Sequence, residues 1–172
     1  MDYLTGHQVR NNVIRKLSLG CSGNTLVLFQ YVEKHGIPLY ENIKTKAAEG
    51  RKVFFVYGGT ETVDRENIRS IVENERDSII VASYGTFSTG INIRNLHNVI
   101  FSSPTKSRIR SLQSIGRSLR QSESKTDATL FDIADDMAIG SYKNFTLNHF
   151  AERITIYNEE QFDYEIHNIN LK

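Results

Sequence analysis

The sequence has no tryptophan, a single cysteine and almost no excess of charge of either sign. One cysteine, Cys21, excludes an internal disulfide and a cysteine-rich zinc site, and it fits a reducing, cytoplasmic compartment. No apolar run reaches the ~18 residues that a membrane helix needs, so we expect no membrane contact. The net charge of +1 excludes a strongly basic overall surface. Any contact with nucleic acid must therefore come from local clusters of basic residues.

The remaining composition is that of an ordinary globular protein. The 172 residues are 39% hydrophobic and 24% charged, which suits one compact domain with a real core. The five histidines show no metal-ligand spacing, so we predict no metal site on this chain.

Short β-rich runs recur along the chain, and each is almost continuously apolar. Such runs are typical of parallel strands that are covered on both faces. The predicted strands are Thr25–Gln30, Val53–Tyr57, Ser78–Ala82, Asn98–Ser102 and Ala128–Ile133.

Helix-like stretches separate these runs. Gly36 and Pro38 divide Tyr31–Ala48 into a turn and a helix that begins near Pro38. The other predicted helices are Asn11–Leu19, Thr62–Asn74, Lys106–Gln121 and Ser141–Ile154. This alternation predicts an α/β fold, a doubly wound and mostly parallel sheet with helices on both faces.

Ligands of such sheets bind beyond the carboxyl ends of the strands. The search for a site therefore narrows to five segments, which are Gln30–Tyr31, Gly58–Thr60, Ser83–Ile93, Ser103–Thr105 with the helix behind it, and Asp132–Asp136.

The predicted helix Lys106–Gln121 carries a stripe of hydrogen-bond donors. Gln113, Arg117 and Arg120 are spaced i, i+4 and i+7, so they share one face beside the apolar stripe. Guanidinium groups pair bidentately with phosphate oxygens and keep their charge at neutral pH. The stripe suits a polyphosphate, although a solvated basic face explains the same spacing.

Gln113–Arg120 matches QxxGRxxR, which is motif VI of superfamily-two helicases. Upstream, VASYGTFSTGINI (Val81–Ile93) resembles motif V, and TLVLFQY (Thr25–Tyr31) resembles the strand of motif IV. The chain therefore resembles the second RecA-like domain of these helicases, over about residues 8 to 135. A RecA-like domain over 1–136 would leave 137–172 as a C-terminal helix with a possible edge strand or extension. Asp163–Leu171 alternates polar and apolar residues, which fits an edge strand or an extension that docks on another chain.

The resemblance implies roles for single residues at the nucleotide. Arg117 and Arg120 would contact the phosphates of ATP from across a cleft, with Arg120 as the arginine finger. Gln113 would help to sense the nucleotide, and Gly90 and Asn92 would lie beside it. Many relatives have Asp at the position of Asn92, so a role that needs a carboxylate there is in doubt.

The resemblance also implies a nucleic-acid track. Ser83 and Thr86, in motif V, would contact phosphodiesters. Gly58, Gly59 and Thr60 would do the same, since unhindered N–H groups can form an anion-binding nest. A tight turn between strand and helix is the alternative explanation of Gly58 and Gly59.

The sequence contains no G-x-x-x-x-G-K-[ST] loop and no Asp-Glu pair after an apolar strand. Asp132, Asp135 and Asp136 follow a strand, but in the family this segment comes after motif VI, so we interpret them as loop residues rather than a Mg²⁺ site. We therefore expect the chain alone not to hydrolyse ATP. ATP and Mg²⁺ would be bound mainly by an N-terminal RecA-like domain.

The resemblance implies an ATP-dependent DNA helicase or translocase that acts on branched or single-stranded DNA in recombination and repair, with RNA left open. The alternative is a non-enzymatic α/β module that binds a phosphorylated ligand or a protein partner through the basic helix. A small receiver-like or nucleotide-binding fold is a weaker option, because it does not account for QxxGRxxR.

Overall fold

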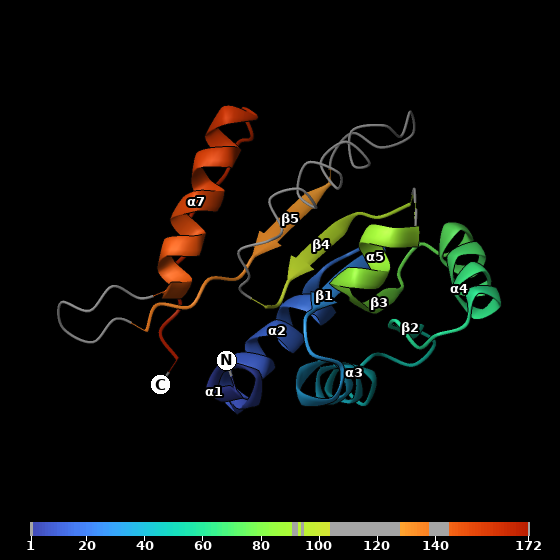
Figure 1. Cartoon of the computed structure of the whole chain (residues 1–172). Coiled ribbons are helices and arrows are strands. Elements are labelled where there is room, and N and C mark those ends of the chain that lie inside the picture. Colours follow the sequence, from blue (N-terminus) through green and yellow to red (C-terminus); the bar gives the residue numbers. More distant parts are fainter. Residues whose placement is uncertain (1, 91–92, 94, 104–127, 138–144, 172) are drawn as a thin grey trace.

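The computed structural model describes residues 2–90, 93, 95–103, 128–137 and 145–171 (Figure 1). In this part of the chain, a five-stranded parallel sheet has the order β2-β3-β1-β4-β5. The strands are β1 (Thr25–Phe29), β2 (Val53–Val56), β3 (Ile79–Ser83), β4 (Asn98–Phe101) and β5 (Thr129–Asp132). All of the predicted strands are confirmed to within about one residue at each end.

Helices connect the strands largely as predicted, and α4 has the predicted bounds. The helices are α1 (Asp2–Gly6), α2 (Gln8–Gly20), the π-helical turn η1 (Val32–Gly36), α3 (Ile37–Lys44), α4 (Thr62–Asn74), α5 (Tyr84–Gly90) and α7 (Phe145–Glu159). Helix α5 was not predicted. The predicted helix Lys106–Gln121 lies outside the described residues.

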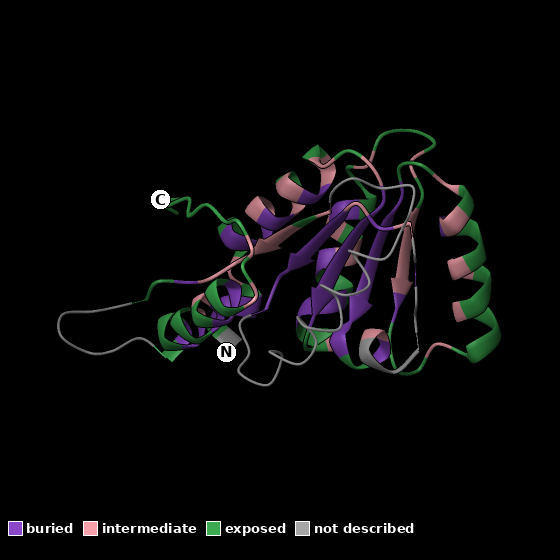
Figure 2. Cartoon of the chain, turned by 90° about the horizontal axis from the view of Figure 1, so that it is seen from above, coloured by how far each residue is buried: buried purple, intermediate pink, exposed green. Residues whose placement is uncertain are grey.

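Side chains of the central strand alternate between two cores. Val27 and Phe29 pack with buried residues of α2 and α3, whereas Leu26 and Leu28 pack with residues of α4, α5 and α7. Figure 2 shows the buried strands at the centre and the exposed outer faces of the helices. The doubly wound architecture with helices on both faces is thus confirmed.

The turn between β1 and α3 depends on a glycine. A Cβ atom on Gly36 would lie 2.5 Å from the ring of Phe29, closer than any real contact. Glycine therefore lets η1 lie directly against the end of β1. Because of this close approach, the neighbouring residue His35 is fully buried, with an exposed fraction of 0%.

Buried ion pairing holds α7 on the last strand. Arg153 Nε lies 2.6 Å from Asp132 Oδ2, and the Tyr157 hydroxyl donates to the same oxygen at 2.8 Å. Burial, together with the Asp132 charge, raises the pKa of Tyr157, so the hydroxyl keeps its proton.

The segment that follows α7 was predicted to form an edge strand or an extension. Asp163–Leu171 forms no strand and is exposed throughout, so the first alternative is wrong, and docking of this segment on another chain stays a prediction. Alternation alone does not make a strand when no neighbouring edge supplies hydrogen bonds. Among the residues that the structure describes, no helix is both long and apolar enough to span a membrane.

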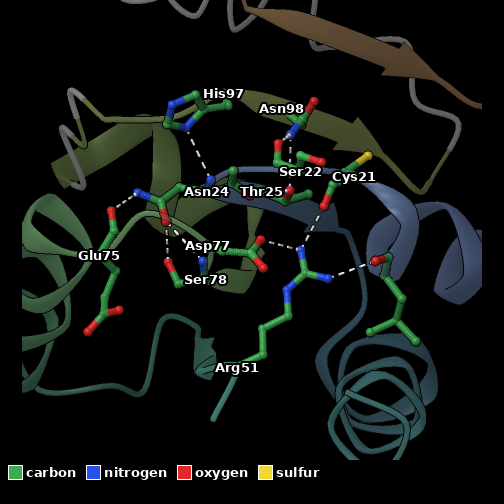
Figure 3. A network of polar contacts seen from close by, with 12 residues as sticks. Cys21, Ser22, Asn24, Thr25, Arg51, Glu75, Asp77, Ser78, His97 and Asn98 are labelled. Carbon is green, nitrogen blue, oxygen red and sulfur yellow. Dashed lines mark hydrogen bonds and ion pairs between the residues drawn. The ribbon is translucent and has the colours of Figure 1, made fainter. Parts of the chain in front are cut away.

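The amino edge of the sheet is tied together by polar side chains (Figure 3). Arg51 donates to the carbonyls of Leu19 and Cys21 at 2.7 and 2.8 Å and pairs with Asp77. Asn24, which is fully buried, joins α4 and the starts of β3 and β4 to the start of β1. Every partner here is another part of the fold, which indicates a structural role for this edge.

Candidate functional site at the carboxyl edge of the sheet

The connectivity of the sheet picks out one place on its carboxyl edge. From β1 the chain continues to β2 on one side, and from β4 it continues to β5 on the other. Ligands of open α/β sheets bind where neighbouring strands lead away in opposite directions. Here that place lies between the carboxyl ends of β1 and β4.

A buried polar cluster occupies this position. His35 Nδ1 lies 3.1 Å from the hydroxyl of Ser103, which also accepts from the backbone N–H of Gln30 at 3.3 Å. The Tyr84 hydroxyl donates to the Ser103 carbonyl at 3.3 Å. Ser103 thereby fixes the chain as it leaves β4 and leads toward the segment that carries QxxGRxxR.

An ion pair lies beside this cluster. Arg10 Nε and Nη2 contact the two oxygens of Asp135 at 2.6 and 2.9 Å, and Nη2 also donates to the Ser102 carbonyl at 2.9 Å. Both side chains are at most 9% exposed. This forked contact joins α2 to the segments after β4 and β5, across 125 residues of sequence.

Burial and the nearby Arg10 charge lower the pKa of His35 to about 4. The unfolded chain, with an ordinary histidine pKa of about 6.5, binds a proton that the folded chain excludes. Stability should therefore fall as the pH drops from about 6.5 to 4, by roughly 3 kcal/mol from this group. Urea unfolding at pH 7 and pH 4.5 would measure this, with His35→Gln expected to show a smaller loss. An equal loss in both proteins would contradict the assignment.

Ser83 and Thr86 meet at the start of α5. Their hydroxyls lie 2.7 Å apart, and the Thr86 N–H donates to the Ser83 oxygen at 3.4 Å. Both residues are buried. The pair caps the first turn of α5, and direct contact of either hydroxyl with nucleic acid stays a prediction.

The loop after β2 forms a tight turn. The Thr60 N–H donates to the Tyr57 carbonyl at 3.0 Å, and the Thr60 hydroxyl accepts from the Tyr57 N–H at 3.0 Å. Within the described part of the chain, the N–H groups of Gly58 and Gly59 have no hydrogen-bond partner, and both residues are exposed.

Arg65 of α4 stabilises this turn by hydrogen bonds to its backbone carbonyls. Its Nε donates to the Thr60 carbonyl at 2.8 Å, and its Nη2 donates to the Gly58 carbonyl at 2.9 Å. Because both bonds go to carbonyls, they leave the N–H groups of Gly58 and Gly59 free to bind an anion.

Nothing in the fold itself requires glycine at position 58. Gly58 has no positive φ, and a Cβ atom there would meet nothing within 4 Å. A tight turn without positive φ accepts most residues. The conformation of the turn therefore does not account for a glycine at position 58, and contact of Gly58 with nucleic acid stays a prediction.

Several predicted residues are not placed. Arg117, Arg120, Gln113 and Asn92 lie outside the described residues, and Gly90 is the last residue of α5. The acids after β5 do not fit a Mg²⁺ site, because Asp132 is paired with Arg153 and Asp135 with Arg10. Within the described part of the chain, no group of three or more potential metal ligands occurs.

Nothing in the sequence singles out Arg10 or His35, whereas Ser103 begins one of the five predicted segments and Tyr57 ends a predicted strand. Arg10 precedes the predicted helix and its partner is distant in sequence, so no local pattern indicates the pair. Arg65 carries a weak signal, since it lies in the first turn of the predicted helix that follows Gly58 and Gly59.

Comparison with known proteins supports this architecture. Residues 9–122 match the model of the helicase conserved C-terminal domain. The ATP-dependent DNA helicase UvsW of enterobacteria phage T4 is 38% identical over 181 residues, covering 98% of this chain and 35% of the relative. The chain thus spans about a third of that protein.

Solved structures agree with the sequence comparison. The crystal structure of T4 UvsW matches with a TM-score of 0.80 over 98% of this chain and 36% of that one. The C-terminal domain of the DEAD-box protein Dbp5 matches with a TM-score of 0.64 at 18% identity, over 94% of this chain and 83% of that one. The second likeness supports the fold alone.

Proposed function

Because the chain belongs to the family of the helicase conserved C-terminal domain, we propose that it is the second motor domain of an ATP-dependent DNA helicase or translocase. The likeness to UvsW over nearly the whole chain carries this proposal. Branched DNA in recombination and repair is the proposed setting, and an N-terminal RecA-like domain is the proposed partner.

In the proposed motor, ATP lies between two domains. Arg117 and Arg120 approach its phosphates from this chain, and Gln113, Gly90 and Asn92 lie near the nucleotide. The first domain supplies the P-loop and the ligands of Mg²⁺, which suits the use of Asp132 and Asp135 in ion pairs here. Bound ATP supplies the phosphoryl group whose transfer drives movement.

The nucleic acid is proposed to cross the carboxyl edge at the turn Tyr57–Thr60. The free N–H groups of Gly58 and Gly59 bind a phosphate, while Arg65 keeps the turn in place. The contact between the hydroxyls of Ser83 and Thr86 stabilises the start of α5, which we place beside this track. Contacts of this kind do not depend on base sequence.

Gly58→Ala should weaken binding of single-stranded DNA a few fold, and Gly58→Pro by ~10-fold, because proline also removes a donor to a charged phosphate. Gly58→Ala does not strain the turn, since a Cβ atom at position 58 has open space and Gly58 has no positive φ. Fluorescence anisotropy of a labelled oligonucleotide would measure the affinities, which should also fall with salt as counterions are released.

Gly20→Ala is the matched control for this experiment. Gly20 also has open space around it, but it ends α2 near the amino edge of the sheet. We expect this variant to bind DNA like the parent. Equal affinities for all of these proteins, or an affinity that does not change with salt, would argue against the proposed track.

A further inference from the structure

A row of aromatic rings runs along one face of the sheet toward the carboxyl edge. Phe29 and Phe55 stack with centroids 5.4 Å apart and planes 8° apart, and Tyr40 lies 5.2 Å from Phe55. Tyr57 follows, 5.5 Å from Phe55. Phe29 is fully buried, whereas Tyr57 is 37% exposed, so the row begins in the core and ends in solvent.

The ring of Tyr57 and the turn beside it fit one another closely. A Cβ atom on Gly59 would lie 2.6 Å from Cε2 of Tyr57 and 3.0 Å from its hydroxyl oxygen. Glycine at position 59 therefore lets the ring lie against the backbone. With Arg65 bonded to the carbonyls of Gly58 and Thr60, the ring and the two free N–H groups form one preorganised surface.

The chemistry of this surface is that of two adjoining parts of a nucleotide. Unpaired backbone N–H groups bind a phosphate oxygen, and an exposed aromatic ring packs against the flat face of a base. An aromatic ring can stack on any of the four bases, because each base has a π-face. A purely apolar partner would leave the N–H groups without acceptors, which costs free energy.

We infer that Tyr57 is a stacking platform for a base of the nucleic-acid strand whose phosphate binds Gly58 and Gly59. This inference rests on the proposed function and extends it from the backbone to the bases. If Tyr57 stacks in this way, the protein should bind a strand with unpaired bases more tightly than a sugar–phosphate chain without bases.

A single-tryptophan reporter tests the stacking directly, because the natural chain contains no tryptophan. Tyr57→Trp should lose much of its fluorescence when oligo-dT binds and little when an abasic oligomer of the same length binds. Tyr164→Trp, on the segment after α7, is the matched control and should respond to neither. A Tyr57→Trp signal that is the same with both oligomers would overturn the inference.

Affinity gives a second, independent readout. Tyr57→Leu keeps an apolar contact with Phe55 but removes the ring, and it should weaken oligo-dT binding by ~10-fold, within the range for one stacked base. Tyr57→Phe should bind like the parent, and none of these changes should affect the abasic oligomer. Unchanged oligo-dT binding by Tyr57→Leu would also overturn the inference.

Other outcomes separate the inference from the proposed function. If the parent binds both oligomers equally and Tyr57→Leu does the same, the track stands and the stacking fails. If the parent binds neither oligomer, the proposed track fails as well. Should Tyr57→Trp respond only to an added first motor domain, the ring belongs to a protein interface and the inference is wrong.

Discussion

Arg120→Ala should lower ATP turnover by ~10³-fold in the complete two-domain motor that we propose. A guanidinium that reaches the transferring phosphoryl group stabilises charge that develops only in the transition state. Its loss should therefore reduce kcat while ATP still binds. Steady-state ATPase assays with saturating DNA, together with equilibrium binding of a fluorescent ATP analogue, would separate the two effects.

Two further variants sharpen this test. Arg108→Ala removes a charge from the same predicted helix, outside the QxxGRxxR motif, and should change turnover by no more than a few fold. Arg120→Lys keeps the charge but loses the planar fork, so it should recover little activity. Turnover of Arg120→Ala within a few fold of the parent would show that this arginine is not the finger.

The strands were predictable because their segments are almost continuously apolar, as expected for a sheet covered on both faces. The central strands β1, β3 and β4 are buried at every position, whereas the edge strands β2 and β5 are mostly half-buried. Val27 and Leu28 face opposite cores, yet both are fully buried. Helix α4 was predictable because Ile68 and Val72, one helical turn apart, pack into the core on one face of the helix.

Helix α5 was not predicted because its sequence, YGTFSTG, is rich in residues that favour turns and strands. Tertiary contacts decide its structure. Tyr84 and Phe87 pack into the core, and the Ser83 hydroxyl accepts from the N–H of Thr86. Local propensity does not contain this information.

The buried polar contacts at the carboxyl edge were not predictable either. The main ones join residues that are far apart in sequence, Arg10 with Asp135 and His35 with Ser103. The sequence does, however, indicate which exposed backbone groups at that edge are candidates for binding. Gly58 and Gly59 were candidates from the sequence, and their N–H groups are free in the described part of the chain.

The turn after β2 therefore differs from the amino edge in what its polar groups do. At the carboxyl edge, the turn Tyr57–Thr60 keeps exposed N–H donors unpaired. At the amino edge, Asn24 and Arg51 use their side chains on carbonyls and acids of the fold itself. Substitutions at Gly58 and Gly59 should therefore affect binding, whereas those at Asn24 and Arg51 should affect stability.

Asn24→Ala should lower the free energy of unfolding by about 4 kcal/mol, because it leaves several buried groups without partners. The Asn24 amide nitrogen donates to the carbonyls of Val72, Glu75 and Asn95 at 2.8–3.0 Å. Its oxygen accepts from the backbone N–H and the hydroxyl of Ser78 at 2.9 and 2.8 Å. A loss of this size is a large part of the total stability of a typical domain.

Asn74→Ala supplies the matched control, since Asn74 is exposed on α4 and makes one side-chain hydrogen bond, to the Ser70 carbonyl. It should cost less than about 1 kcal/mol. Asn24→Asp should be at least as harmful as Asn24→Ala near pH 7, because a buried carboxylate would face three carbonyl oxygens. Urea titrations would give the free energies, and a cost for Asn24→Ala no larger than that of the control would contradict the role of this network.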